Sequence, residues 1–147
     1  MTTVDYPDIP LHDLMRRTAA RWPERPALSW AGRTRSFGEF EVESTRVANA
    51  LHALGLGRGD RLSLYLPNCP EYELLFYGAS MLGAIACPLN AAYRDHELTH
   101  QINDAGATVV AVHHTLWPVV ERCRGRLGTV ERFLVVGGDR KSTRLNS

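Results

Sequence analysis

One short motif in the sequence has residue types and a spacing that could do chemistry. It is His96-Glu97-Leu98-Thr99-His100, the H-E-x-x-H pattern of zinc hydrolases. Positions i and i+4 share one face of a helix, so the two imidazoles could bind one zinc ion. Glu97 would then serve as the general base.

The surroundings of this motif weaken the zinc interpretation. In the longer form of the pattern a glycine and a third histidine follow, but Asn103 and Gly106 occupy those positions. Glu121, farther along the chain, could be offered as a third ligand. The helix that carries the motif would be short, and its apolar side should pack on a sheet. Zinc hydrolysis therefore stays an alternative function.

Two other stretches could suggest ligand binding. Gly55-Leu56-Gly57-Arg58-Gly59 follows an expected helix and precedes an expected strand, whereas a dinucleotide-binding fingerprint follows a strand and opens a helix. His113-His114 ends an expected strand, where neighbouring side chains point to opposite faces. We therefore expect neither a dinucleotide site nor a joint metal site from these residues.

The composition excludes several function classes. The chain has 147 residues, 44% hydrophobic and 22% charged, as in a globular domain, and its net charge of +1 predicts no nucleic-acid or anionic-membrane partner. The spacing of Cys69, Cys87 and Cys123 suggests neither a disulfide framework nor a zinc knuckle. Two of these cysteines lie beside proline in apolar surroundings, so we expect reduced thiols and a cytoplasmic location.

Membrane insertion is not expected. Leu74–Tyr93 contains no charged residue and is long enough to raise the question of a spanning helix. Gly83, Pro88 and Asn90 interrupt it, and its second half has the features of a strand. Met1–Pro10 lacks the apolar core of a secretory signal. We predict a buried helix followed by a strand, and no transmembrane segment.

Hydrophobic periodicity predicts an alternation of strands and helices. Strands are expected to begin near residues 62, 84, 108 and 132, with one helix in each gap, which predicts an α/β fold with a parallel sheet and alternating helices. Two of these helices are expected at Asp95–Ala105 and Thr115–Leu127. An amphipathic helix, Leu11–Trp22, and a β-hairpin of Ala27–Ala31 and Thr34–Phe37 come first.

Local signals predict several boundaries. Ser36 and Glu39 match a capping box that starts one helix. Asn68 is expected to cap the next helix, and Gly83 to close it in the left-handed conformation. We expect a short buried strand at Ala84–Leu89, directly after this helix.

The stretch from Gly59 to Asn90 also resembles a known family. Its segments Gly59-Asp60-Arg61, Leu66-Pro67-Asn68-x-Pro70-Glu71, Leu82-Gly83-Ala84 and Pro88-Leu89-Asn90 look like those of adenylate-forming (AMP-binding) enzymes. These enzymes include acyl-CoA synthetases, aryl-CoA ligases, luciferases and peptide-synthetase adenylation domains. The resemblance covers about Leu11–Asp139 and implies the N-terminal subdomain of the adenylate-forming fold.

The resemblance implies an acid–thiol ligase of the acyl-CoA synthetase type. Such an enzyme activates a carboxylic acid, here a fatty or aryl acid, with ATP and Mg²⁺ to an acyl-adenylate, and transfers the acyl group to coenzyme A. Pro88-Leu89-Asn90 favours the CoA ligases. Peptide-synthetase adenylation domains more often have Pro-Leu-Asp after a tyrosine, where Cys87 stands here.

The nucleotide-binding motifs of this family match no stretch of the chain. They are a glycine-rich Ser/Thr loop, a later Thr-Gly-Asp segment and a lysine in a mobile C-terminal domain. We therefore assign no catalytic, cofactor-binding or metal-binding residue here. We expect the chain to be catalytically silent alone, with ATP, Mg²⁺, coenzyme A and the small-molecule carboxylate bound only by the full-length enzyme.

The boundaries of the domain follow from the same resemblance. Residues 1–139 are expected to be a partial N-terminal domain, and the polar residues 140–147 are interpreted as a non-native tail. The strand Arg132–Val136 would then have an unpaired edge. A self-contained flavodoxin-like binding domain remains an alternative. A receiver domain is disfavoured, because Leu66-Pro67-Asn68 offers no carboxylate for Mg²⁺.

Overall fold

The computed structural model describes residues 7–138 and the backbone of residues 145–146. The predicted non-native tail, 140–147, lies outside the described residues apart from those two positions. The elements in chain order are α1 (Leu11–Arg21), β1 (Pro26–Trp30), β2 (Arg33–Ser36), α2 (Phe37–Ala53), β3 (Arg61–Tyr65), α3 (Pro70–Met81), β4 (Ile85–Pro88), α4 (Asp95–Ala105), β5 (Val109–His113), α5 (Trp117–Cys123), β6 (Arg132–Val136) and β7 (Leu145–Asn146).

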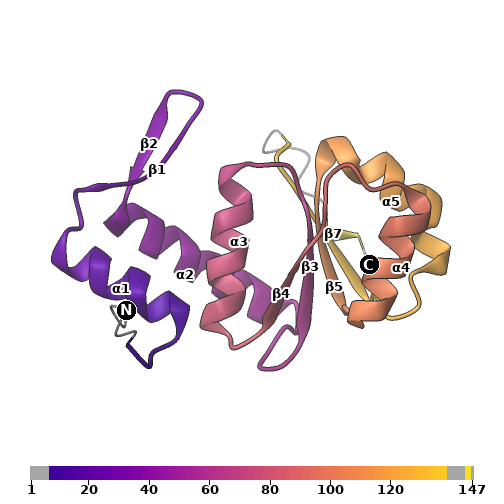
Figure 1. The fold of residues 1–147 in the computed structure, drawn as a ribbon, viewed down its shortest axis with the longest axis horizontal. Helices are drawn as coiled ribbons and strands as arrows, with labels where there is room; N and C mark the ends of the chain where they lie inside the picture. Colours follow the sequence, from indigo (N-terminus) through magenta and orange to yellow (C-terminus); the bar gives the residue numbers. More distant parts are fainter. Residues whose placement is uncertain (1–6, 139–144, 147) are drawn as a thin grey trace, which may run out of the picture.

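A five-stranded sheet lies at the centre of the fold (Figure 1). Its order is β4-β3-β5-β6-β7, with β4, β3, β5 and β6 parallel and β7 antiparallel to β6. Helices α2 and α3 cover one side, and α4 and α5 cover the other. The predicted α/β fold, with a helix and a hairpin before the parallel sheet, is confirmed.

Both faces of the central strands are buried. Along β5, Val109 and Ala111 belong to an apolar cluster with residues of α2 and α3, whereas Val110 and Val112 belong to a second cluster with α4 and α5. Alternate side chains of a strand point to opposite faces, so one strand contributes to both clusters. Tyr65, at the end of β3, is also buried, and its hydroxyl donates to the Tyr93 carbonyl at 2.7 Å.

Helices α2 and α3 pack closely because Gly78 has no side chain. A Cβ at Gly78 would lie 2.8 Å from Cγ1 of Val47 and 3.2 Å from the backbone nitrogen of Ala48. Neither distance leaves room for a methyl group. Gly78 therefore sets how near α3 comes to α2, and with it how both helices cover the sheet.

Helix α1 and the β1–β2 hairpin form an outlying unit beside α2 and α3 (Figure 1). A small apolar cluster of Met15, Phe40 and Leu74 joins α1 to α2 and α3, and the Phe40 ring meets Tyr77 edge-on at 5.4 Å between ring centroids. The predicted capping box at the start of α2 is confirmed. The Ser36 amide donates to the Glu39 carboxylate at 2.8 Å, and the Glu39 amide donates to the Ser36 hydroxyl at 3.3 Å.

Two expectations around α3 are wrong. Asn68 is not the N-cap: Cys69 holds that position without a side-chain cap bond, because Pro70 fixes the first helical φ angle and needs no N–H partner. The strand after α3 is not buried either. It is the edge strand β4, and Ile85 is 48% exposed. Gly83 does adopt the predicted left-handed conformation, with φ at 68°.

Two expectations near the C-terminal end also need correction. The predicted helix Thr115–Leu127 is divided into a 3₁₀ turn at His114–Leu116, the short α5 and a second 3₁₀ turn at Arg124–Arg126, which contains the helix-weakening Gly125. The edge of β6 is not open along its whole length, because residues 145–146 pair with Phe133 and Leu134.

No helix in the described part of the chain combines the length and the apolar character needed to cross a bilayer. The uncharged stretch Leu74–Tyr93 is divided between α3, which ends at Met81, and the strand β4.

We predict that Gly78→Ala destabilises the protein by about 1–3 kcal/mol, because the added methyl group overpacks the α2–α3 contact. At an unhindered helix position the same change should stabilise by up to about 1 kcal/mol. Urea denaturation measures the difference. The double variant Gly78→Ala/Val47→Ala should recover part of the loss relative to Val47→Ala alone, since Cγ1 of Val47 is removed. A single variant as stable as the wild type would contradict this role for Gly78.

Candidate functional site

The H-E-x-x-H motif forms the start of α4 and has a structural role there. His96 and His100 are exposed, and the buried face of the helix is formed by Leu98 and Ile102. The Arg94 amide donates to the Glu97 carboxylate at 3.2 Å, so Glu97 caps the helix. Donation from the backbone N–H groups of Glu97 and Arg94 holds the pKa of the Glu97 carboxyl below its usual range.

The first residue of α4 ties this helix to the segment of α5. The Asp95 carboxylate accepts from the Arg122 guanidinium at 2.9 and 3.2 Å, and Arg126 lies at 4.0 Å. Hydrogen bonding from Arg122 lowers the pKa of Asp95. Across the part of the chain that the structure describes, no three His, Cys, Asp or Glu side chains are grouped to hold a metal ion. The motif is therefore accounted for by capping and packing.

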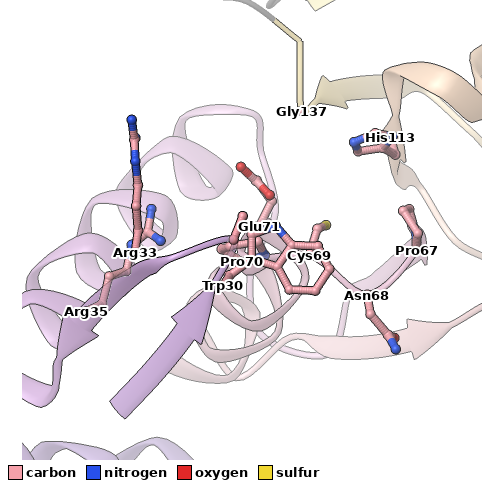
Figure 2. A pocket seen from close by; sticks show the side chains of 11 residues that line it. Trp30, Arg33, Arg35, Pro67, Asn68, Cys69, Pro70, Glu71, His113 and Gly137 are labelled. Carbon is pink, nitrogen blue, oxygen red and sulfur yellow. The ribbon is translucent and has the colours of Figure 1, made fainter. Parts of the chain in front are cut away.

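A crevice of about 610 Å³ lies elsewhere, at the carboxyl ends of the strands (Figure 2). Three separate parts of the chain enclose it: the β1–β2 hairpin, the turn between β3 and α3, and the ends of β5 and β6. Its lining residues are Trp30, Ala31, Arg33, Arg35, Pro67, Asn68, Cys69, Pro70, Glu71, His113 and Gly137.

The position of this crevice follows from the topology of the sheet. The connection after β3 leads to β4 on one side, whereas the connection after β5 leads to β6 on the other. The adjacent carboxyl ends of β3 and β5 are therefore the topological switch point, where open α/β sheets bind ligands. The order of the four parallel strands matches that of flavodoxin-like sheets, which explains why the sequence also allowed that alternative.

His113, the last residue of β5, is one of the titratable groups that line the crevice (Figure 2). Its Nδ1 lies 2.7 Å from the Thr115 hydroxyl and accepts from the Thr115 amide at 3.4 Å. Burial, and then the neighbouring His114, lower the pKa of His113. The ring also fills the space above Gly137, which has a φ of 79°, so a side chain at Gly137 would overlap it.

The expectation for the histidine pair needs correction. The rings of His113 and His114 are 4.5 Å apart between centroids rather than on opposite faces, because His114 leaves the strand for a 3₁₀ turn. The other reactive group in the crevice is the Cys69 thiol, whose pKa is raised by burial. Cys69, Cys87 and Cys123 are all free thiols.

The turn after β3 does not fit a triphosphate. Residues 67–70 contain no glycine, and both prolines lack the N–H group that would donate to a phosphate. Glu71 and Glu73 place negative charge in the first turn of α3, where a phosphate would need positive charge. Among the described residues, Glu71 is the single carboxylate lining the crevice, which is too few oxygen ligands for Mg²⁺.

Sequence reasoning missed the crevice because its residues come from distant segments. Trp30 and Arg33 precede the five-stranded sheet in the sequence, whereas His113 is the last residue of β5 and Gly137 directly follows β6. One signal was available. Residues that directly follow successive parallel strands meet at one edge of the sheet, which groups residues 67–69 with His113 and Gly137.

Comparison with known proteins gives a consistent result. The family model of AMP-binding enzymes matches residues 15–146. The long-chain-fatty-acid–CoA ligase of Bacillus subtilis (strain 168) is 31% identical over 129 residues, which is 88% of this chain. The 4-coumarate–CoA ligase 2 of Oryza sativa subsp. japonica is 33% identical over 132 residues, or 82% of this chain. The chain spans 23% of the length of each of these two relatives.

A solved structure agrees with the sequence relatives. The anthranilate CoA ligase AuaEII, crystallised in complex with anthranoyl-AMP, superposes with a TM-score of 0.85 at 30% identity. The match covers 94% of this chain and 27% of that one.

We predict that His113 makes the protein less stable in mild acid. A lowered pKa means that the unfolded chain binds the proton more tightly, so stability falls as the pH drops below the ordinary histidine value of 6.5. His113→Gln should flatten this part of the curve of unfolding free energy against pH, measured by urea denaturation between about pH 7.5 and about pH 5.

Two matched variants serve as controls for this prediction. His114→Gln should reduce the slope without abolishing it, because burial is the larger cause of the His113 shift. His52→Gln, at an exposed position on α2, should leave the slope unchanged. An equal slope in wild type and His113→Gln would show that His113 does not carry the effect.

Proposed function

The chain belongs to the AMP-binding enzyme family, and from this premise we propose that it is the N-terminal part of an acid–CoA ligase. The proposed enzyme activates a carboxylic acid with ATP to an acyl-adenylate and transfers the acyl group to coenzyme A. The observation that carries the proposal is the family match over residues 15–146, together with a fold shared with an anthranilate CoA ligase.

The proposed substrate is a fatty or aryl carboxylic acid. The relatives support both classes, since one is named for long-chain fatty acids and another for 4-coumarate. Pro88-Leu89-Asn90 supports coenzyme A as the acceptor. ATP, Mg²⁺ and coenzyme A would act in the complete enzyme, in the cytoplasm, where three free thiols would stay reduced.

The contribution that we propose for this chain is structural. It would supply the sheet and its covering helices as part of a larger enzyme, while the catalytic and nucleotide-binding groups come from other parts of that enzyme. Two features support this division. The turn after β3 has no glycine and two prolines that lack an N–H group, and two glutamates begin α3. Residues 1–139 would accordingly be a partial domain, with 140–147 as a non-native tail.

The source gene tests the proposal directly. We expect the reading frame beyond codon 140 to encode a glycine-rich Ser/Thr loop followed by Pro-Lys-Gly, because triphosphate binding needs flexible backbone donors and a positive side chain. Sequencing that region is the measurement. A genomic frame without such a loop would contradict the assignment to a CoA ligase.

Purified chain 1–147 tests the structural role separately. Incubated with ATP, Mg²⁺ and either a long-chain fatty acid or 4-coumarate, it should release no pyrophosphate above a protein-free control. The Bacillus subtilis ligase provides the positive control. Pyrophosphate release with formation of an acyl-adenylate by the chain alone would refute catalytic silence but leave the family assignment intact.

A further inference from the structure

Two histidines lie one helical turn apart on the exposed side of α4. His96 and His100 are both exposed, while Leu98 and Ile102 form the buried face of the same helix. Capping uses Glu97 and packing uses the two apolar side chains, so neither imidazole has a part in holding the helix in place. A pair of exposed imidazoles therefore remains to be explained after the helix itself has been.

The helix sets the distance between the two rings. Both histidines lie within the continuous α-helix Asp95–Ala105. Positions i and i+4 of such a helix share one face, with their Cβ atoms about 5–6 Å apart. Both side chains lean toward the N-terminal end of the helix, so one nitrogen of each imidazole can reach the same ion. Imidazole is a suitable ligand for Zn²⁺, Cu²⁺ and Ni²⁺.

The fold holds this pair in place before an ion binds. A helix of 11 residues is marginal in water when it is isolated. In the protein Leu98 and Ile102 are fully buried, and Gly106 closes the helix at a φ of 64°. At the other end the Arg122 guanidinium donates to the Asp95 carboxylate at 2.9 Å. The folded chain therefore presents the two rings at a fixed spacing, which lowers the entropic cost of chelation.

The charges around the pair allow a cation to approach. Asp104 lies one turn beyond His100 and is also exposed, on the same side of the helix. The guanidinium groups of Arg122 and Arg126 lie 2.9 and 4.0 Å from the Asp95 carboxylate, which offsets part of their charge. Asp104 is about 12 Å along the helix axis from His96, so it attracts the ion but does not ligate it together with both histidines.

We propose that His96 and His100 form a two-histidine surface site for a divalent transition-metal ion of the Ni²⁺, Cu²⁺ and Zn²⁺ class. Two protein ligands leave the other coordination positions of the ion to water. The site binds without hydrolysis, because the Glu97 carboxylate accepts from the Arg94 amide at the start of the helix and the described residues supply no third ligand. It is therefore distinct from a zinc hydrolase centre and independent of the proposed ligase function.

Titration calorimetry with NiCl₂ tests the proposal on the 147-residue chain, prepared without a histidine tag and freed of metal. Nickel is the probe because the free thiols of Cys69 and Cys87 favour softer ions. We expect saturable binding of one ion per chain. His100→Gln should weaken it by about a hundredfold, because a single imidazole loses the gain in effective concentration that the second one provides.

Two matched variants serve as controls. His100→Gln/Gln101→His keeps the number of histidines but moves one ring off the shared face, so it should bind as weakly as His100→Gln. His52→Gln/His114→Gln removes two exposed histidines elsewhere and should bind like the wild type. Melting curves check that all variants fold. The proposal is overturned by an absence of saturable binding, by full affinity in the moved-histidine variant, or by an equal loss in His52→Gln/His114→Gln.

Discussion

Burial of both faces of β3 and β5 is the constraint on which the rest of this structure depends. The two strands pair in parallel in the middle of the sheet, and the side chains of β5 alternate between an apolar cluster with α2 and α3 and another with α4 and α5. A parallel sheet needs helices on both faces. Because both faces of the sheet must be covered, each covering helix turns its apolar side toward the sheet. In α4 this orientation leaves the histidines of the H-E-x-x-H motif exposed to solvent.

The same pair of strands creates the crevice. Connections that run in opposite directions from β3 and β5 leave a gap between their carboxyl ends, and the hairpin closes it from the far side. The chemistry of this gap differs from that of nucleotide-binding sheets. Prolines and glutamates stand where a phosphate-binding turn would have glycines and a free helix N-terminus. The turn after β3 therefore lacks the glycine-rich backbone of a phosphate-binding turn, and the cationic groups of the crevice, Arg33 and Arg35, come from the hairpin instead.

The arginines of α1 differ in their surroundings. A net charge of +1 arises from 17 basic and 16 acidic residues. Around α1, Arg16 is used in ion pairs with Asp13 and Glu41, while Arg17 and Arg21 face outward beside Leu14. One side of α1 packs on the domain, and the opposite side carries both apolar and cationic side chains.

The sequence by itself determined the order and type of the main elements, since period-2 and period-3.6 patterns, the capping box at Ser36 and the left-handed glycine at position 83 act over a few residues. It also determined the family, through short segments along one strand–helix–strand unit. Only the tertiary structure decided that β4 is an exposed edge, that His113 meets Gly137, and that the hairpin faces the turn after β3. These outcomes depend on contacts between segments far apart in the chain, and local periodicity carries no information about which strands become neighbours.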